Sequence, residues 1–373
     1  MRIALAMLLD AYRELNARKL FWITLVMSGM VVLSYGSIGF NESGMSTFYG
    51  LQQIDSEYLR KGSLMSEVLY RSIFSWIMVG LWLAWTATIL ALISTTTIFP
   101  DFMAGGSIDL VLSKPIRRTT LFAAKYMVSL LFVVLQVSLF SLGTFLCLGM
   151  RLDDWDWKIF AAIPIVTVFY SYLFSVNVLL GVWTRSALAA LLVTMLLWSS
   201  LFGVTLAEGL MYKERTKLVI QTERSDRLIA DLEAHLATSD RDESRRARLM
   251  VEVADARSLR DTQNEAIDKM DRWHRPIRVI QSVLPKTGET INMLDRLLKR
   301  DTDVNILDIF RGNVVPDGSG GFRTTNTSQD REVERRMEAE VNRRSVWYVV
   351  GTSLVFEVVI LSIACLIFVR RDF

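Results

Sequence analysis

One ionisable side chain lies inside a mainly apolar run and is the first candidate for chemistry. Glu357 belongs to the run 346–369, which is long enough to cross a lipid bilayer. A charged group at the bilayer centre costs roughly 2.5 to 3.5 kcal/mol, so its presence needs a specific reason. We expect Glu357 either to face a water-filled path, where it would contact the substrate or pair with a basic group such as Lys125 or Arg185, or to form a buried structural pair with no role in transport.

Two side-chain amides, Gln136 and Asn177, interrupt other apolar runs. Each can hydrogen-bond to a neighbouring helix, an interaction worth about 0.6 kcal/mol within membranes. We therefore assign both residues to helix packing first and to a transport path second. The two cysteines, Cys147 and Cys365, lie in apolar runs, and the two histidines are isolated in a charged region. This distribution predicts neither a disulfide framework nor a metal site.

The sequence does not contain the short motifs that accompany nucleotide or hydrolytic chemistry. Neither G-x-x-x-x-G-K-[ST] nor G-x-S-x-G, H-E-x-x-H or C-x-x-C occurs. We therefore predict that the chain is not an enzyme and carries no cofactor of its own. Energy from a nucleotide would have to come from a partner polypeptide.

Six mainly apolar runs predict six transmembrane helices. A hydrocarbon core of roughly 30 Å requires about 20 apolar residues per helix, and 51% of the 373 residues are hydrophobic. The predicted fold class is an all-α integral membrane protein. The runs are 20–40, 73–95, 122–149, 159–183, 187–206 and 346–369.

Basic residues in the short flanking segments predict the orientation of these helices. If every run crosses the membrane, the basic residues all fall on one side, and positive charge marks the cytoplasmic side. The acidic segment 151–157, with its two tryptophans, falls on the other side. We therefore predict a multi-pass protein of the inner (cytoplasmic) membrane with both termini in the cytoplasm. The basic residues are Arg13, Arg18, Lys19, Lys114, Arg117, Arg118, Arg185, Arg370 and Arg371.

The predicted spans divide the chain into four parts. Residues 1–19 have apolar residues at helical spacing and predict an amphipathic helix in the membrane interface, with a simple extension of span one as the alternative. Residues 20–208 hold five spans and a cytoplasmic loop at 99–121. Residues 209–345 form a helical extracytoplasmic insert, and residues 346–373 hold span six and a short tail.

The sequence of the insert predicts an antiparallel helical hairpin, with a coiled coil as one form of it. Apolar residues recur at three- and four-residue spacing in two charged stretches, and Asp240 and Glu243 between them have the spacing of a helix start. A shorter helix at 288–300, turn-rich chain at 311–321 and a charged helix at 329–344 are expected to follow. The hairpin would be either a docking arm, for an outside partner or for a second copy of the chain in a dimer, or a solvated spacer.

The loop at 99–121 is too polar to span a membrane and too apolar for a plain linker. Residues 108–112 form an apolar cluster that Pro115 ends. Arg117 and Arg118 then suit an anionic membrane surface. The pattern predicts a short helix presented to the cytoplasm.

This segment resembles the permeases of type 2 ATP-binding-cassette (ABC) exporters. In that family a glycine and an apolar helix precede Leu-Ser-x-Pro, a basic residue and a lysine that opens the third span. The residues that match in this order are Gly106, Leu112, Ser113, Pro115, Arg118 and Lys125. The chain departs from the family pattern in two places. At residues 100–105 it does not have the acidic–basic pair that often stands there in the family, and its helical insert is longer than usual.

The resemblance implies a partner protein and the residues that would bind it. The family's loop docks on a separate ATPase subunit, which binds ATP and Mg²⁺, and the permease acts as a homodimer or with a paralogue in the lipid bilayer. The residues implied for the ATPase contact are Ser107, Ile108, Asp109, Leu110, Val111, Leu112, Ser113, Lys114 and Pro115. Arg117, Arg118 and Lys125 would form the basic inner interface.

Other functions are compatible with parts of this pattern. A non-transporting scaffold or sensor would use the helical insert to bind an extracytoplasmic partner, but it would not need an apolar helix facing the cytoplasm. A channel or ion-coupled carrier commonly shows repeated halves, and none is visible here. The 42 basic and 39 acidic residues nearly balance, so no nucleic-acid partner is expected.

Overall fold

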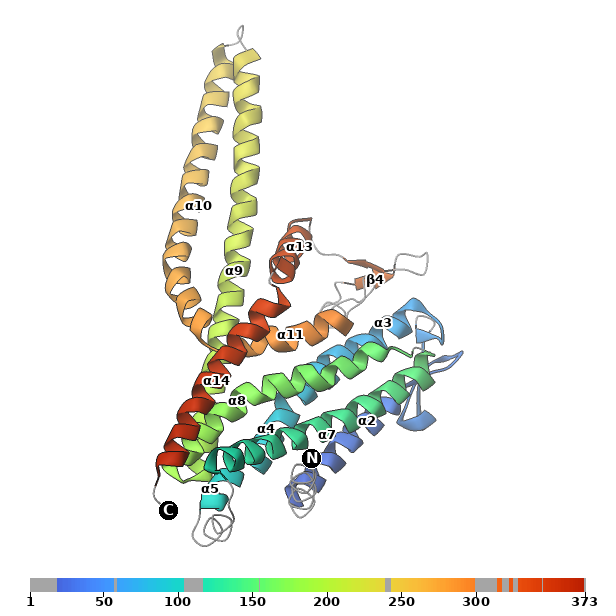
Figure 1. Cartoon of the computed structure of the whole chain (residues 1–373). Helices are drawn as coiled ribbons and strands as arrows, with labels where there is room; N and C mark the ends of the chain where they lie inside the picture. Colours follow the sequence, from blue (N-terminus) through green and yellow to red (C-terminus); the bar gives the residue numbers. More distant parts are fainter. Residues whose placement is uncertain are drawn as a thin grey trace. The chain divides into compact units, whose positions relative to one another are not determined.

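The computed structural model describes residues 19–56, 59–103, 117–153, 155–238, 243–298, 314–316, 322–324, 328–343 and 345–371 (Figure 1). Most of these residues are helical. The predicted interfacial helix, except for Lys19, and residues 107–115 of the predicted ATPase contact lie outside the described residues.

Within the described residues, six helical segments are long and apolar enough to cross a membrane, which confirms the predicted all-α membrane fold. They are α2 (Lys19–Gly36), the segment Met65–Met103, α7 (Arg118–Leu152), the segment Trp157–Thr184, α9 (Ala187–Thr238) and α14 (Val346–Arg370). The second span, Met65–Met103, consists of four consecutive elements: most of α3 (Leu64–Ile73), η3 (Phe74–Ala87), α4 (Thr88–Thr95) and α5 (Ile98–Met103). The fourth span, Trp157–Thr184, consists of η4 (Trp157–Ala161) and α8 (Ala162–Thr184).

The second span is wound more loosely than an α-helix over much of its length. Residues Phe74–Ala87 form the π-helix η3. The hydroxyl groups of Thr86 and Thr88 accordingly donate to carbonyl groups five residues earlier, at Leu81 and Leu83. Long π-helical stretches are rare and are often found at functional sites.

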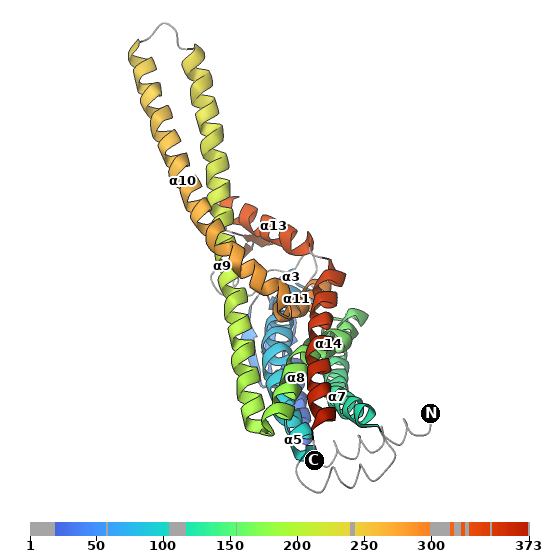
Figure 2. The same ribbon diagram turned by 60° about the vertical axis from the view of Figure 1, so that its left-hand side comes forward.

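Contacts divide the chain into two compact units, which we describe separately. The bundle unit comprises Met1–Ser199, Pro285–Thr325 and Val349–Phe373. In it α7 packs against α2 and α8, and α14 lies beside α8 (Figures 1 and 2). Its core is aromatic and aliphatic, with side chains such as Phe132, Phe174 and Leu92 fully buried. The short helix α11 (Thr287–Leu298) closes this core by burying Leu294 and packing on α8.

A small antiparallel sheet follows the first span. Strands β1 (Gly39–Phe40), β2 (Gly44–Thr47) and β3 (Gln52–Asp55) pair in that order, with Phe40 opposite Met45 and Ser46 opposite Gln53. The short helical turn η1 (Phe48–Gly50) joins β2 to β3. Arg151, near the end of α7, donates two hydrogen bonds to the carbonyl oxygen of Gly36 (3.0 and 2.7 Å), so the first and third spans end together beside this sheet.

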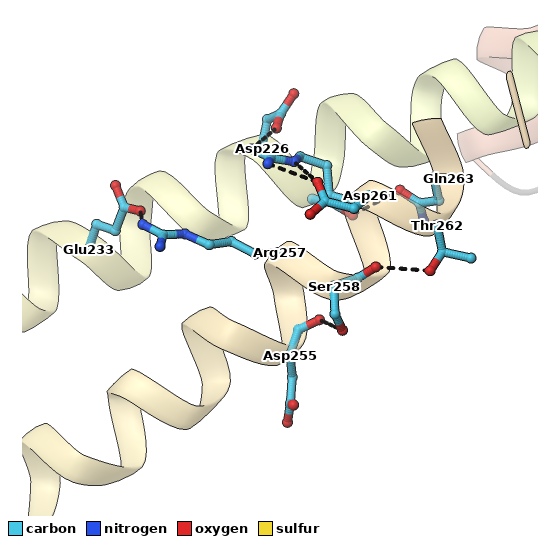
Figure 3. Close-up of polar contacts among 10 residues, drawn as sticks. Asp226, Glu233, Asp255, Arg257, Ser258, Asp261, Thr262 and Gln263 are labelled. Atoms are coloured by element: carbon cyan, nitrogen blue, oxygen red, sulfur yellow. Dashed lines mark hydrogen bonds and ion pairs between the residues drawn. The ribbon is translucent and has the colours of Figure 1, made fainter. Parts of the chain in front are cut away.

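The hairpin unit comprises Ser200–Leu284 and Asn326–Tyr348. Here α9 and α10 (Glu243–Val283) run antiparallel, as predicted from the sequence. Figure 3 shows the ion pair between Arg257 and Glu233 (2.6 Å), and Arg215 contacts Asp271 (2.7 Å) nearer the base. Apolar residues at helical spacing, including Ile220, Ile229 and Val253, are buried in this unit.

A third helix joins the hairpin. Helix α13 (Ser328–Arg343) binds α9 through Arg336, which donates to both carboxylate oxygens of Glu223 (2.8 Å each). Two parallel bonds between a guanidinium and a carboxylate group fix both distance and direction. The hairpin unit is therefore a small helical assembly, rather than two helices alone.

The structure corrects several sequence-based boundaries. Helix α9 does not end near residue 206 but runs without interruption into the hairpin, because the single Gly209 is too weak a break. Helix α10 contains Pro276 and continues beyond it to Val283. The segment 311–321, expected to be turn-rich chain, contributes strand β4 (Val314–Pro316), which pairs with β5 (Phe322–Thr324). Ser345 separates α13 from α14, which were expected to be continuous.

Candidate functional site

The carboxyl group of Glu357 sits between three spans. The hydroxyl group of Tyr126 in α7 donates to its Oε1 atom (2.8 Å), and that of Ser171 in α8 donates to its Oε2 atom (2.7 Å). All three side chains are buried, Glu357 being 7% exposed. Buried oxygen atoms need such donors, because an unpaired polar group in an apolar environment is costly. Glu357 therefore links α7, α8 and α14 at one point.

The expected pairing of Glu357 with a basic residue is not what the structure shows. Its hydrogen-bond donors are neutral hydroxyl groups, and among the described residues it forms no ion pair. Lys125 precedes Tyr126 on α7, and neighbouring positions on a helix point about 100° apart, so only one of them faces Glu357. The ammonium group of Lys125 lies over the ring of Phe102 instead, 5.4 Å from its centre. Arg185 ends α8 in a left-handed conformation.

A row of aromatic rings leads away from this carboxyl group into the bundle. Tyr126 stacks on Phe174 (5.4 Å between ring centres), and Phe174 stacks on Tyr170 (5.5 Å). The hydroxyl group of Tyr170 then hydrogen-bonds to that of Thr95 at 2.5 Å. Polar groups of four spans are thus connected through one buried aromatic stack.

Gln136 lies beside the far end of this row. It is 4% exposed and, with Tyr170 and Thr88, lines a small cavity of about 10 Å³. Its Oε1 atom accepts no hydrogen bond from the described residues. The amide was expected to bind a neighbouring helix, but the residues opposite it are mainly apolar, among them Leu83 and Val166. A cavity of this size is close to the minimum for one water molecule.

Asn177 joins α8 to α9. Its amide nitrogen donates to the hydroxyl group of Thr194 at 3.5 Å, and both side chains are fully buried. Thr194 itself donates to the carbonyl oxygen of Ala190. The geometry gives Asn177 a packing contact, at some distance along α8 from Ser171.

Two arginines hold the ends of three spans together, at the end of the bundle where α7 begins. Arg118, at the start of α7, donates to the carbonyl oxygens of Val369 (3.0 Å) and Arg371 (2.9 Å) at the end of α14. Arg371 donates in turn to the carbonyl oxygens of Val182 and Trp183 at the end of α8. Carbonyl groups at helix ends have no partner within their own helix, and a cation there also suits the helix dipole. We call this set the arginine clamp.

Aromatic residues fill the space beside the arginine clamp. Phe99 and Phe102 of α5 contact Phe122 of α7 and Phe368 of α14, with ring centres 5.1 to 6.2 Å apart. Pro100 packs against Gly181 of α8, where a side-chain carbon would approach the proline ring to 3.5 Å. Helix α5, which leads directly into residues 104–116, is thus embedded among three spans.

The three residues of the predicted basic interface lie in different surroundings. Arg117 is exposed, whereas Arg118 belongs to the arginine clamp and Lys125 to the aromatic cluster. The loop predicted at 99–121 is shorter, because α5 extends to Met103 and α7 begins at Arg118.

Sequence reasoning missed Tyr126, Ser171 and Arg371 as members of these networks. Tyrosine and serine are common in membrane helices, so their types alone carried no signal. The pairing of span three with span six could have been suggested by Arg118 and Arg371, which both lie at the ends of apolar runs on the same predicted side. Among the residues that the structure describes, no group of three or more His, Cys, Asp and Glu could hold a metal ion.

Six spans around a buried polar network define a multi-pass integral membrane protein. The chain belongs to the ABC-2 family transporter proteins, whose family model matches residues 13–373. It is therefore a permease subunit of an ABC transporter, the membrane part that works with an ABC ATPase in the lipid bilayer, and the sequence resemblance is confirmed. No curated protein and no solved structure matches it.

Proposed function

We propose that this permease subunit exports a substrate, driven by ATP that a separate ATPase subunit binds with Mg²⁺ and hydrolyses. Residues 107–115 would form the contact with that subunit. The basic residues at the span ends, such as Arg117, support a cytoplasmic position for this loop and for both termini. The hairpin unit would then lie on the opposite side of the membrane.

The observation that carries the proposal is the position of Arg118. It follows the proposed contact directly and donates to the last carbonyl groups of α14, while Arg371 links the same point to α8. A push on the loop would therefore move the ends of three spans together. Helix α7 has 35 residues, which is about 50 Å at 1.5 Å per residue, so it would carry such a movement across the bilayer.

We further propose that two copies of the chain, or this chain and a paralogue, enclose the substrate path. Helices α9 and α14 support this arrangement, because only 17% and 22% of the residues in their most apolar windows are buried. In the second span that share is 56%. Glu357 would hold α14 against α7 and α8 in this assembly.

Affinity purification of the tagged chain from its native membranes, followed by mass spectrometry, tests the ATPase contact. Leu110→Asp places a charge in the apolar segment 108–112, so we expect it to abolish recovery of an ABC ATPase while the chain still reaches the membrane. Leu110→Ile is the matched control and should retain the ATPase. Equal recovery with Leu110→Asp would contradict the assignment of the contact, and recovery of no ATPase with any variant would favour a scaffold.

A further inference from the structure

Large apolar side chains are exposed on the turn that connects β2 to β3 and on β3 itself. Leu51 is 91% exposed, Phe48 and Tyr49 are each 64% exposed, and Ile54 is 48% exposed. Single exposed apolar residues are common on proteins, but here four lie within seven residues, and larger exposed apolar surfaces mark interaction sites. We call these residues the apolar tip.

The backbone of the apolar tip is held in an unusual conformation. Phe48 and Tyr49 both have positive φ angles, 51° and 58°, followed by Gly50 at 96°. Bulky side chains rarely adopt this left-handed region, and strained conformations of this kind concentrate at functional sites.

Hydrogen bonds fix the apolar tip beside the last turn of the first span. The amide group of Tyr49 donates to the carbonyl oxygen of Ser37 (3.2 Å), and its hydroxyl group donates to that of Leu33 (3.2 Å). The guanidinium group of Arg151, at the end of the third span, lies 5.8 Å from the centre of the Tyr49 ring. The tip therefore lies beside the ends of the first and third spans.

The spans beside the apolar tip also expose apolar side chains. Met30 and Leu33 of α2 and Met150 of α7 are 60% or more exposed, in helices that cross the membrane. Trp157, at the start of the fourth span, is exposed on the same end of the bundle and packs on Phe145 of α7 (4.9 Å). Aromatic residues favour the headgroup region of a bilayer, where their rings meet both apolar and polar surroundings.

We propose that the apolar tip inserts into the headgroup region of the bilayer and anchors the ends of the first and third spans at a fixed depth. Its partner is the lipid surface itself, with the Phe48 ring and the Leu51 side chain in the acyl boundary. This inference rests on the membrane-spanning fold and is independent of ATP-driven export.

Spin labels in reconstituted vesicles test the proposal. Leu51→Cys and Phe48→Cys, each in a chain with Cys147→Ala and Cys365→Ala, would carry a nitroxide in vesicles of phosphatidylcholine and phosphatidylglycerol with no other protein. Ser43→Cys, on the exposed turn before β2, is the control. We expect the labels at 51 and 48 to collide severalfold more with oxygen, relative to a water-soluble nickel complex, than the label at 43.

Two results would overturn the proposal. Equal oxygen-to-nickel collision ratios at positions 51, 48 and 43 would place the apolar tip in water. Low collision rates with both reagents at positions 51 and 48 would show that protein, such as a second copy of the chain, covers it. Because Leu51 is almost wholly exposed, its replacement should leave the fold intact.

Discussion

At the scale of single residues, the buried polar groups divide into satisfied and unsatisfied ones. Glu357 has a donor for each carboxylate oxygen, whereas the Oε1 atom of Gln136 has none among the described residues. The sequence identified Glu357 because a carboxyl group in an apolar run is rare. The sequence could not identify the donors, because the direction in which a hydroxyl group points depends on how α7, α8 and α14 are oriented relative to one another.

The Glu357 network predicts a measurable coupling with Tyr126. We expect Tyr126→Phe to lower the free energy of unfolding by about 0.6 to 1.7 kcal/mol, the range for hydrogen bonds between membrane helices. The effect should become smaller when Glu357 is replaced by Leu, because only the longer contact from the Tyr126 hydroxyl group to the carbonyl oxygen of Ser171 (3.2 Å) then remains. Thermal or denaturant unfolding in mild detergent measures both values.

Ser362 provides the control on the same helix. Ser362 is exposed, and its hydroxyl group donates to the carbonyl oxygen of Val358 within α14. Ser362→Ala should therefore change stability little. Additive effects of Tyr126→Phe and Glu357→Leu would mean that their hydrogen bond contributes nothing to the bundle.

Gln136 and Asn177 form a matched pair with opposite expected results. Asn177→Leu should destabilise the bundle by about 0.6 kcal/mol or more, because it removes the hydrogen bond to Thr194. Gln136→Leu should leave stability unchanged or raise it by about 1 kcal/mol, because it removes an unpaired acceptor and fills a cavity. The same unfolding measurement tests both variants. If Gln136→Leu lowered the free energy of unfolding more than Asn177→Leu does, Gln136 would have a hydrogen-bond partner, such as a bound water molecule.

At the scale of elements, hydropathy predicted which segments are spans but not where the helices end. Spans and hairpin helices have different compositions. Helix α9 nevertheless contains both a span and one arm of the hairpin, because no residue between Leu206 and Thr238 is a strong enough break to end the helix. The π-helical winding of η3 likewise has no signal in its apolar sequence. The antiparallel hairpin could be predicted, since its apolar spacing and its helix start are local features.

Helix α13 predicts a pH dependence within the hairpin unit. Hydrogen bonds from Arg335 and then Arg336 lower the pKa of the Glu332 carboxyl group below its ordinary value. The charged carboxylate therefore stabilises α13 above the pKa of the unfolded chain, about 4.3, and this contribution is lost as the pH falls through the lower folded value. We expect amide hydrogen exchange in α13, corrected for intrinsic rates, to accelerate below about pH 4.

Glu332→Gln separates this effect from general acid unfolding. The variant should lose the part of the pH dependence that comes from Glu332, while Arg336 keeps its two bonds to Glu223 at neutral pH. An identical exchange profile in the parent and in Glu332→Gln would mean that Glu332 does not stabilise α13.

At the scale of the whole molecule, the chain combines a permease fold with connections that the family pattern did not reveal. The resemblance at Leu112, Ser113 and Pro115 pointed to the family, which the family model confirms over residues 13–373. Arg118 was expected at an anionic membrane surface, but it contacts the end of α14 instead. Such a contact joins residues 251 positions apart, and no local pattern could predict it.

The central claim is that movement of the loop reaches the sixth span through the arginine clamp. The most direct measurement is the distance between spin labels at Met30→Cys in α2 and Leu366→Cys in α14, both exposed positions, with Cys147 and Cys365 replaced by Ala. The labelled chain would be purified with its ATPase and diluted with unlabelled chain. Distances would be compared with and without ATP in the parent, in Arg118→Gln and in Arg117→Gln.

The neighbouring Arg117 is the matched control, because it is exposed and has the same charge. We predict that ATP changes the distance in the parent and in Arg117→Gln but not in Arg118→Gln, although the ATPase is recovered with all three. The same ATP-dependent change in Arg118→Gln would contradict the account.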